Sequence, residues 1–106
     1  MVHSFNQYKK MKAVFISYNQ AYHEEILEIL LVSGQRGYTY WEEVKGRGSL
    51  DGEPHLGDHA WPTLNSALLV FAEDSIVPGM KQLLRELDEK SPAMGLRCFS
   101  WNVDAD

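Results

Sequence analysis

The chain lacks several features that would place it in a specialised class of protein. It has no run of about 18 consecutive apolar residues, the length that a membrane-spanning helix needs. It has one cysteine, Cys98, and so cannot form an internal disulfide, which is typical of proteins from a reducing compartment. Basic residues are few, with 10 Lys and Arg against 15 Asp and Glu, and they form no stripe that could follow a phosphate backbone. We therefore expect a cytoplasmic protein that neither inserts into a membrane nor binds nucleic acid.

Known catalytic motifs are also missing. The sequence contains neither an H-E-x-x-H nor a G-x-S-x-G pattern, and no serine or cysteine has the local signature of a nucleophile. We therefore expect the protein not to be an enzyme. Its 106 residues, 44% of them hydrophobic, are enough for one core, and we expect a single domain over residues 11–106. Residues 1–10 have no apolar centre of the kind found in export signals and are predicted to form a flexible tail.

The order of apolar segments predicts the fold class. Short runs rich in β-branched and aromatic residues predict strands over 11–18, 38–44, 66–72 and 96–103. Leucines and isoleucines at helical spacing predict one helix that Asn19 can cap and Gly34 can end, and another that Asp74 or Ser75 can cap. The order strand, helix, strand, strand, helix, strand is typical of an α+β, ferredoxin-like βαββαβ sandwich with a four-stranded antiparallel sheet.

Aromatic residues are more numerous on the predicted sheet than one core requires. Two helices can cover only one face of a sheet, and an exposed aromatic patch on the other face is unusual in a monomer. The sequence therefore predicts that copies of the chain bury this second face against one another. The aromatic residues behind this prediction are expected on both faces of the strands over 38–44 and 96–103, and they are Tyr38, Tyr40, Trp41, Phe99 and Trp101.

The strand and loop motifs resemble those of a known family. The shared residues are Met11-Lys12, the glycine that ends the first helix, Gly37-Tyr38-Thr39, and Glu-Val-Lys-Gly-Arg-Gly over 43–48. This pattern is similar to that of the PII signalling proteins. The resemblance implies a homotrimer in which residues from about 45 to 63 form a sensing loop, the T-loop, near clefts between subunits. It also implies a non-catalytic regulator of a partner, such as a membrane transporter, with Thr39, Gly46 and Gly48 in the ligand cleft.

The chain departs from the PII pattern where that family binds nucleotides. Ser49 and Leu50 stand where the family has a glutamine that helps to hold a magnesium nucleotide and 2-oxoglutarate. The segment 91–95 lacks the lysine that compensates phosphate charge in the family. We therefore expect ATP and ADP to bind weakly or not at all, with a conventional nucleotide-binding PII regulator as the alternative.

The long segment over 45–63 contains a cluster of possible metal ligands. Glu53, His55, Asp58 and His59 combine two imidazoles with two carboxylates, donors that suit zinc, copper or nickel. Polar loops are often rich in these residues, so an ordinary polar loop is an equally open interpretation. If the cluster does bind metal, the protein is a metal sensor or a CutA-like divalent metal-binding protein, and a metal hydrolase is a more remote alternative because the loop lacks a rigid supporting shell.

Overall fold

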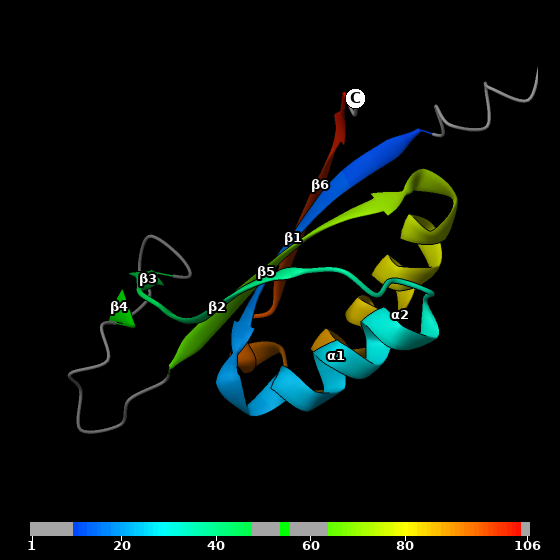
Figure 1. The fold of residues 1–106 in the computed structure, drawn as a ribbon. Helices are drawn as coiled ribbons and strands as arrows, with labels where there is room; N and C mark the ends of the chain where they lie inside the picture. The colour runs from blue at the N-terminus through cyan, green and yellow to red at the C-terminus, as the bar shows by residue number, and fades with distance from the viewer. Residues whose placement is uncertain (1–9, 48–53, 56–63, 105–106) are drawn as a thin grey trace, which may run out of the picture.

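The computed structural model describes residues 10–47, 54–55 and 64–104, and it has two helices and a four-stranded sheet (Figure 1). Residues 1–9 of the predicted tail, and most of the segment 48–63, lie outside the described residues. Short 3-10 turns precede each helix and the last strand. The elements are β1 (Met11–Asn19), α1 (His23–Val32), β2 (Thr39–Val44), β3 (Gly46–Arg47), β4 (Pro54–His55), β5 (Asn65–Glu73), α2 (Val77–Lys90) and β6 (Arg97–Val103).

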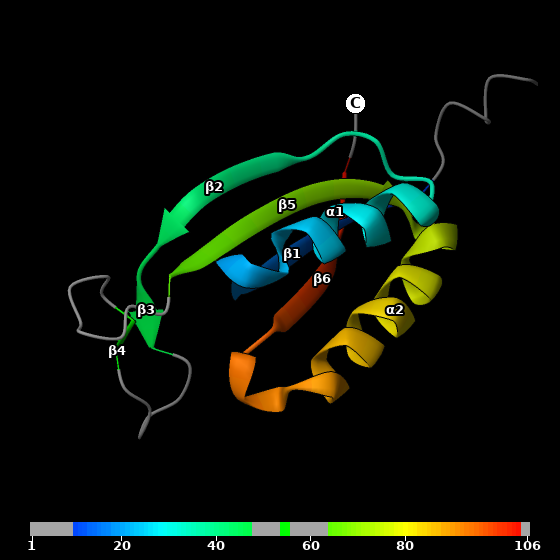
Figure 2. The same ribbon diagram turned by 90° about the horizontal axis from the view of Figure 1, so that it is seen from below.

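The main sheet has the strand order β2-β5-β1-β6, and every neighbouring pair is antiparallel. The two helices lie on one face of this sheet (Figure 2). This arrangement confirms the predicted α+β, ferredoxin-like sandwich. The helices in the described part of the chain are too short or too polar to cross a membrane.

The hydrophobic core lies between the helices and this covered face of the sheet. Alternate residues of β1 point into it, and Val14 and Ile16 stand opposite Val70 and Leu68 of β5. The period of two along the strands and of three to four along the helices brings these side chains together. The helices add Ile26, Leu30, Val77, Met80, Leu84 and Leu87 to the core.

The segments before the helices agree only in part with the predicted caps. The side chain of Asn19 accepts a hydrogen bond from the backbone N–H of Ala21 at 2.9 Å, as expected of a capping residue, but it caps the 3-10 turn that precedes α1. The prediction that Asp74 or Ser75 caps α2 was wrong, because both residues lie inside a 3-10 turn. Pro78 in the first turn of α2 already has the helical φ and has no N–H to satisfy, so a side-chain cap is less needed there.

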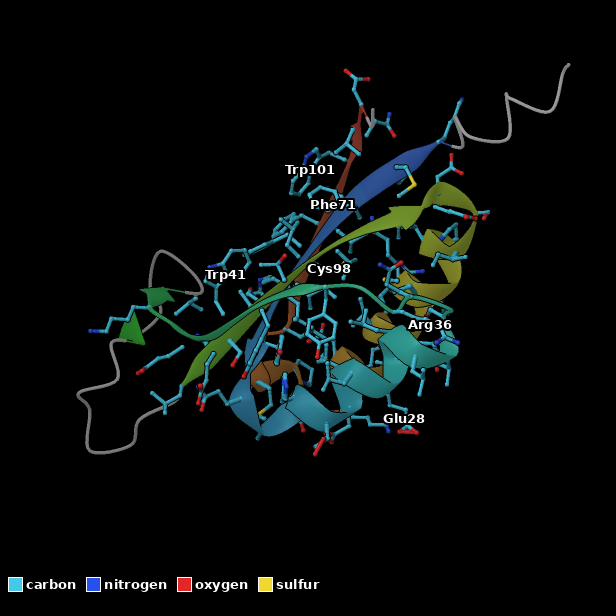
Figure 3. The ribbon with its side chains drawn as sticks, in the orientation of Figure 1. Glu28, Arg36, Trp41, Phe71, Cys98 and Trp101 are labelled. Atoms are coloured by element: carbon cyan, nitrogen blue, oxygen red, sulfur yellow. The ribbon has the colours of Figure 1, made fainter. Side chains whose placement is uncertain are left out.

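The second face of the sheet carries no helix and is strongly apolar. Phe71, Phe99 and Trp101 remain 51%, 58% and 48% exposed there. The strand register places Ala13 between Phe71 and Trp101, and it places Phe15 beside Phe99. Figure 3 shows Trp41, Phe71 and Trp101 on the side of the sheet away from the helices. Trp41, Phe99 and Trp101 of the predicted aromatic set therefore share one surface with Phe71, called the open sheet face below. Tyr40 lies on the opposite, helix-covered face, where it pairs with Leu68 and stacks on His23.

Candidate functional site

The structure places only some of the residues predicted for the ligand cleft and the metal site. Thr39 is the exposed first residue of β2 and stands opposite Leu69. Gly46 lies in β3 and pairs with His55 of β4, so the structure brings the backbones of these two residues together. The other predicted residues, Gly48, Glu53, Asp58 and His59, lie outside the described residues.

The β3–β4 ladder marks the root of the 45–63 loop. It consists of two residue pairs, Gly46 with His55 and Arg47 with Pro54, and forms a small sheet of its own. Both strands lie beyond the end of β2 and away from the helices (Figures 1 and 2). The sequence predicted no regular structure here, because two-residue strands rich in glycine and proline have no readable alternation.

A register shift near the end of β2 sets the direction in which the chain leaves the sheet. The pairing with β5 is regular as far as Trp41, opposite Ala67, and resumes at Val44, opposite Asn65. Such irregularities increase the local twist and are frequent beside functional sites. The shift lies just before the β3–β4 ladder, so it determines how the loop root projects from the sheet.

Two side chains hold this register shift in place. The carbonyl oxygen of Glu42 accepts one hydrogen bond from the hydroxyl of Ser66 and another from the side-chain amide of Gln20, each at 2.6 Å. Ser66 is fully buried, and Gln20 follows the end of β1. A carbonyl that leaves the regular ladder still needs donors, and these two side chains supply them. These two hydrogen bonds therefore hold the backbone at the point where the loop leaves β2.

A pair of stacked rings connects β2 to the start of α1. The ring of His23, at the start of α1, stacks on Tyr40 with the centroids 4.5 Å apart. The His23 Nδ1 atom is also hydrogen-bonded to the hydroxyl of the buried Tyr18 at 2.7 Å. Burial, followed by the nearby Tyr40 and Tyr38 phenols, raises the pKa of Tyr18 well above its ordinary value, so its hydroxyl stays protonated. This stack joins α1, β1 and β2 next to the loop root.

The described residues do not decide the metal prediction. Among them, no group of three or more His, Cys, Asp or Glu side chains is close enough to hold an ion. Three of the four predicted ligands lie outside the described ranges, and only the backbone of His55 is described. The metal site in the 45–63 loop therefore stays a prediction from the sequence.

The free thiol of Cys98 is half-buried on β6. Burial raises the pKa of the Cys98 thiol, and this effect outweighs the opposing charges of Lys81 and Arg85. Because the thiolate is the reactive form, we expect the native protein to react with iodoacetamide more slowly at pH 7 to 8 than the same chain in denaturant. The native rate should still be rising at pH values where the denatured chain has levelled off. Equal rates and equal pH profiles would show that the fold does not shield the thiol.

Comparison with known proteins gives a fold and leaves the ligand open. No protein-family model and no curated protein sequence matches the chain. A structure of CPII, a nitrogen regulatory PII-like protein from Thiomonas intermedia K12, bound to ADP, AMP and bicarbonate, is similar, with a TM-score of 0.75 and 16% identity over 91% of this chain and 88% of that one. The apo form of CPII has a TM-score of 0.70 and 14% identity, with 91% of each chain covered.

A third similar structure is that of a putative PII-like signaling protein from Thermus thermophilus. Its TM-score is 0.66 and its identity 21%, over 92% of this chain and 90% of that one. Identities this low establish the fold alone. The PII-like fold that the sequence motifs predicted is thereby confirmed over nearly the whole length of the chain.

Proposed function

We propose that this chain is a non-catalytic PII-like regulatory protein that works as a homotrimer. The observation that carries the proposal is the open sheet face, on a fold shared with PII-like proteins. Monomeric soluble proteins rarely keep a contiguous apolar surface of this kind in water. Copies of the chain that pack their sheets together bury it, and three such copies leave clefts between neighbouring subunits.

The loop root favours a sensing role for the 45–63 segment. The register shift held by Ser66 and Gln20 fixes where the segment leaves β2. A fixed base with a long polar loop allows a bound ligand to change the shape offered to a partner. In this proposal Thr39, Gly46 and Gly48 line the cleft, and the partner is a regulated protein such as a membrane transporter.

Adenine nucleotides are the first ligands to test. We predicted that ATP and ADP bind weakly or not at all. The similar Thiomonas protein was solved with ADP, AMP and bicarbonate, which favours weak binding of ADP over no binding. The missing glutamine and lysine still argue for poor compensation of phosphate charge. We therefore expect calorimetric titration to show weak binding of ADP, in the presence and absence of bicarbonate.

The titration should be repeated on a protein that cannot assemble. Because the proposed cleft lies between subunits, a monomeric variant should lose the heat of ADP binding. Retained binding in that variant would place the nucleotide within one subunit and contradict the proposed cleft. Tight, magnesium-dependent binding to the parent would favour the alternative, a conventional nucleotide-sensing PII regulator.

In this proposal the 45–63 loop binds a transition-metal ion. The CutA-like alternative makes the same prediction. We expect zinc, copper or nickel to bind the parent protein and to bind a His55→Ala/His59→Ala variant at least tenfold more weakly, since each lost ligand bond costs more than about 1.4 kcal/mol. Binding should weaken below about pH 6, because an imidazole with a pKa near 6.5 must lose its proton before it can ligate. Competition titration with a chelating dye measures these affinities.

A histidine outside the loop provides the control for the metal titration. His3→Ala removes an imidazole from the N-terminal segment and should leave the affinity unchanged. If the parent binds none of the three ions, or if the loop variant binds as tightly as the parent, the histidines are ordinary polar loop residues. The prediction of metal sensing by the loop would then be wrong.

A further inference from the structure

A cavity lies between α2 and the edge strand β6, within one subunit and apart from the loop root. Its volume is about 260 Å³, below the range of about 300–1,000 Å³ typical of pockets for drug-sized ligands. Its lining combines apolar and charged side chains. The lining residues are Lys81, Leu84, Arg85, Asp88, Leu96 and Cys98.

The charged residues of the cavity share one face of α2. Lys81, Arg85 and Asp88 are spaced by four and three residues, so their side chains lie along the same side of the helix. Both cations act on the pKa of Cys98, which places them near the β6 side of the cavity. Arg85 donates one hydrogen bond to Gln82 at 3.0 Å and keeps its other N–H groups available. The cavity therefore combines two cations with one carboxylate.

Asp88 supplies the second, independent observation. Its Oδ1 atom is buried and accepts no hydrogen bond from any described residue. Buried carboxylate oxygens without a donor are costly and rare in folded proteins. No ion pair joins Asp88 to Lys81 or Arg85 within the described part of the chain, although all three line the same cavity. The negative charge of Asp88 therefore has no partner among the described residues, and a ligand cation at the cavity would supply one.

We propose that this cavity binds a free amino acid. The ligand carboxylate would pair with Lys81 and Arg85, and the ligand ammonium group would donate to the accessible oxygen of the Asp88 carboxylate. Leu84 and Leu96 form the apolar part of the lining and would contact the ligand side chain. A nucleotide fits poorly here, because its several negative charges would meet only two cations and would approach a carboxylate. This site goes beyond the proposed function and requires neither the trimer nor the loop.

Cys98 allows binding to be followed without a label, because it lines the cavity and is the only cysteine of the chain. The experiment measures the rate at which Cys98 reacts with iodoacetamide in the presence of each standard L-amino acid other than cysteine. Calorimetry then gives the affinity for any amino acid that protects the thiol. We expect at least one of them to slow the reaction and to release or absorb heat at one site per chain.

Matched variants on α2 separate the proposed contacts from general effects of charge. Lys81→Met and Asp88→Asn should each weaken binding by about tenfold or more, as expected for loss of a charged hydrogen bond. Lys90→Met and Glu89→Gln make the same changes at exposed positions outside the cavity and should leave affinity unchanged. If Lys81→Met does not fold, as judged by circular dichroism, Arg85→Gln replaces it.

Several results would overturn the proposal. One is that no amino acid slows the reaction of Cys98 with iodoacetamide and none gives a heat of binding. Another is that the cavity variants and the exposed controls lose affinity equally. Equal protection by acetate would also overturn it, because acetate has no ammonium group for Asp88. The trimer is tested separately, since amino-acid binding should persist in a variant that no longer assembles.

Discussion

Replacement of Phe99 by aspartate is expected to convert the proposed trimer into a monomer. Phe99 lies on the open sheet face beside Phe15, with more than half of its side chain exposed in the single chain. Burying the exposed part between subunits would contribute about 1–2 kcal/mol for each copy. A carboxylate at the same place would cost several kcal/mol for each copy, because it would lose water without gaining a partner. These changes add over three subunits, so assembly should be lost at micromolar concentration.

The control for this substitution introduces the same charge on another surface. Leu31 is an exposed apolar residue on α1, 67% exposed, on the helical side of the molecule. Leu31→Asp should leave the mass measured by light scattering unchanged, while Phe99→Asp should give the mass of one chain. Loss of assembly in both variants, or in Leu31→Asp alone, would place the interface elsewhere and contradict the role of the open sheet face.

The second large effect concerns the core. Leu68 is fully buried on β5, and it stands opposite Ile16 on β1 and Tyr40 on β2. Leu68→Ala is expected to lower the free energy of unfolding by about 2–5 kcal/mol, from lost burial and the cavity left behind. Chemical denaturation, followed by circular dichroism at one fixed protein concentration, measures this change.

The matched change at an exposed apolar residue should have little effect. Val32 is exposed at the end of α1, and Val32→Ala should change the free energy of unfolding by less than about 0.5 kcal/mol. The comparison is best repeated in the Phe99→Asp background, because the stability of an assembled protein depends on its concentration. A similar small change for both substitutions would show that β5 is not at the centre of the core.

The fold could be predicted because its elements differ clearly in their periodicity. The run 67–71 has no polar break, which is typical of a central strand, and β5 is indeed paired on both sides. Gly34 was predicted to end the first helix, and it has a φ of 89°, a conformation that other residues rarely adopt. The excess of aromatic residues on strands, given only two helices, likewise predicted the open sheet face.

The loop root and the cavity could not be predicted, for two different physical reasons. The register shift at Glu42 depends on Ser66 and Gln20, which lie more than 20 residues away from it in opposite directions. No sequence pattern shows which backbone carbonyl a serine or glutamine side chain will bind. The cavity depends on how β6 lies against α2, and Lys81, Arg85 and Asp88 have the spacing of any solvated helix face.

Light scattering on the unmodified chain, from low to high micromolar concentration, is the most direct test of the account. We expect one species with three times the 12.1 kDa mass of a single chain, and no dependence on nucleotide, metal or amino acid. A monomer over this whole range would contradict it. The open sheet face would then be exposed to water, and the proposed clefts between subunits would not exist.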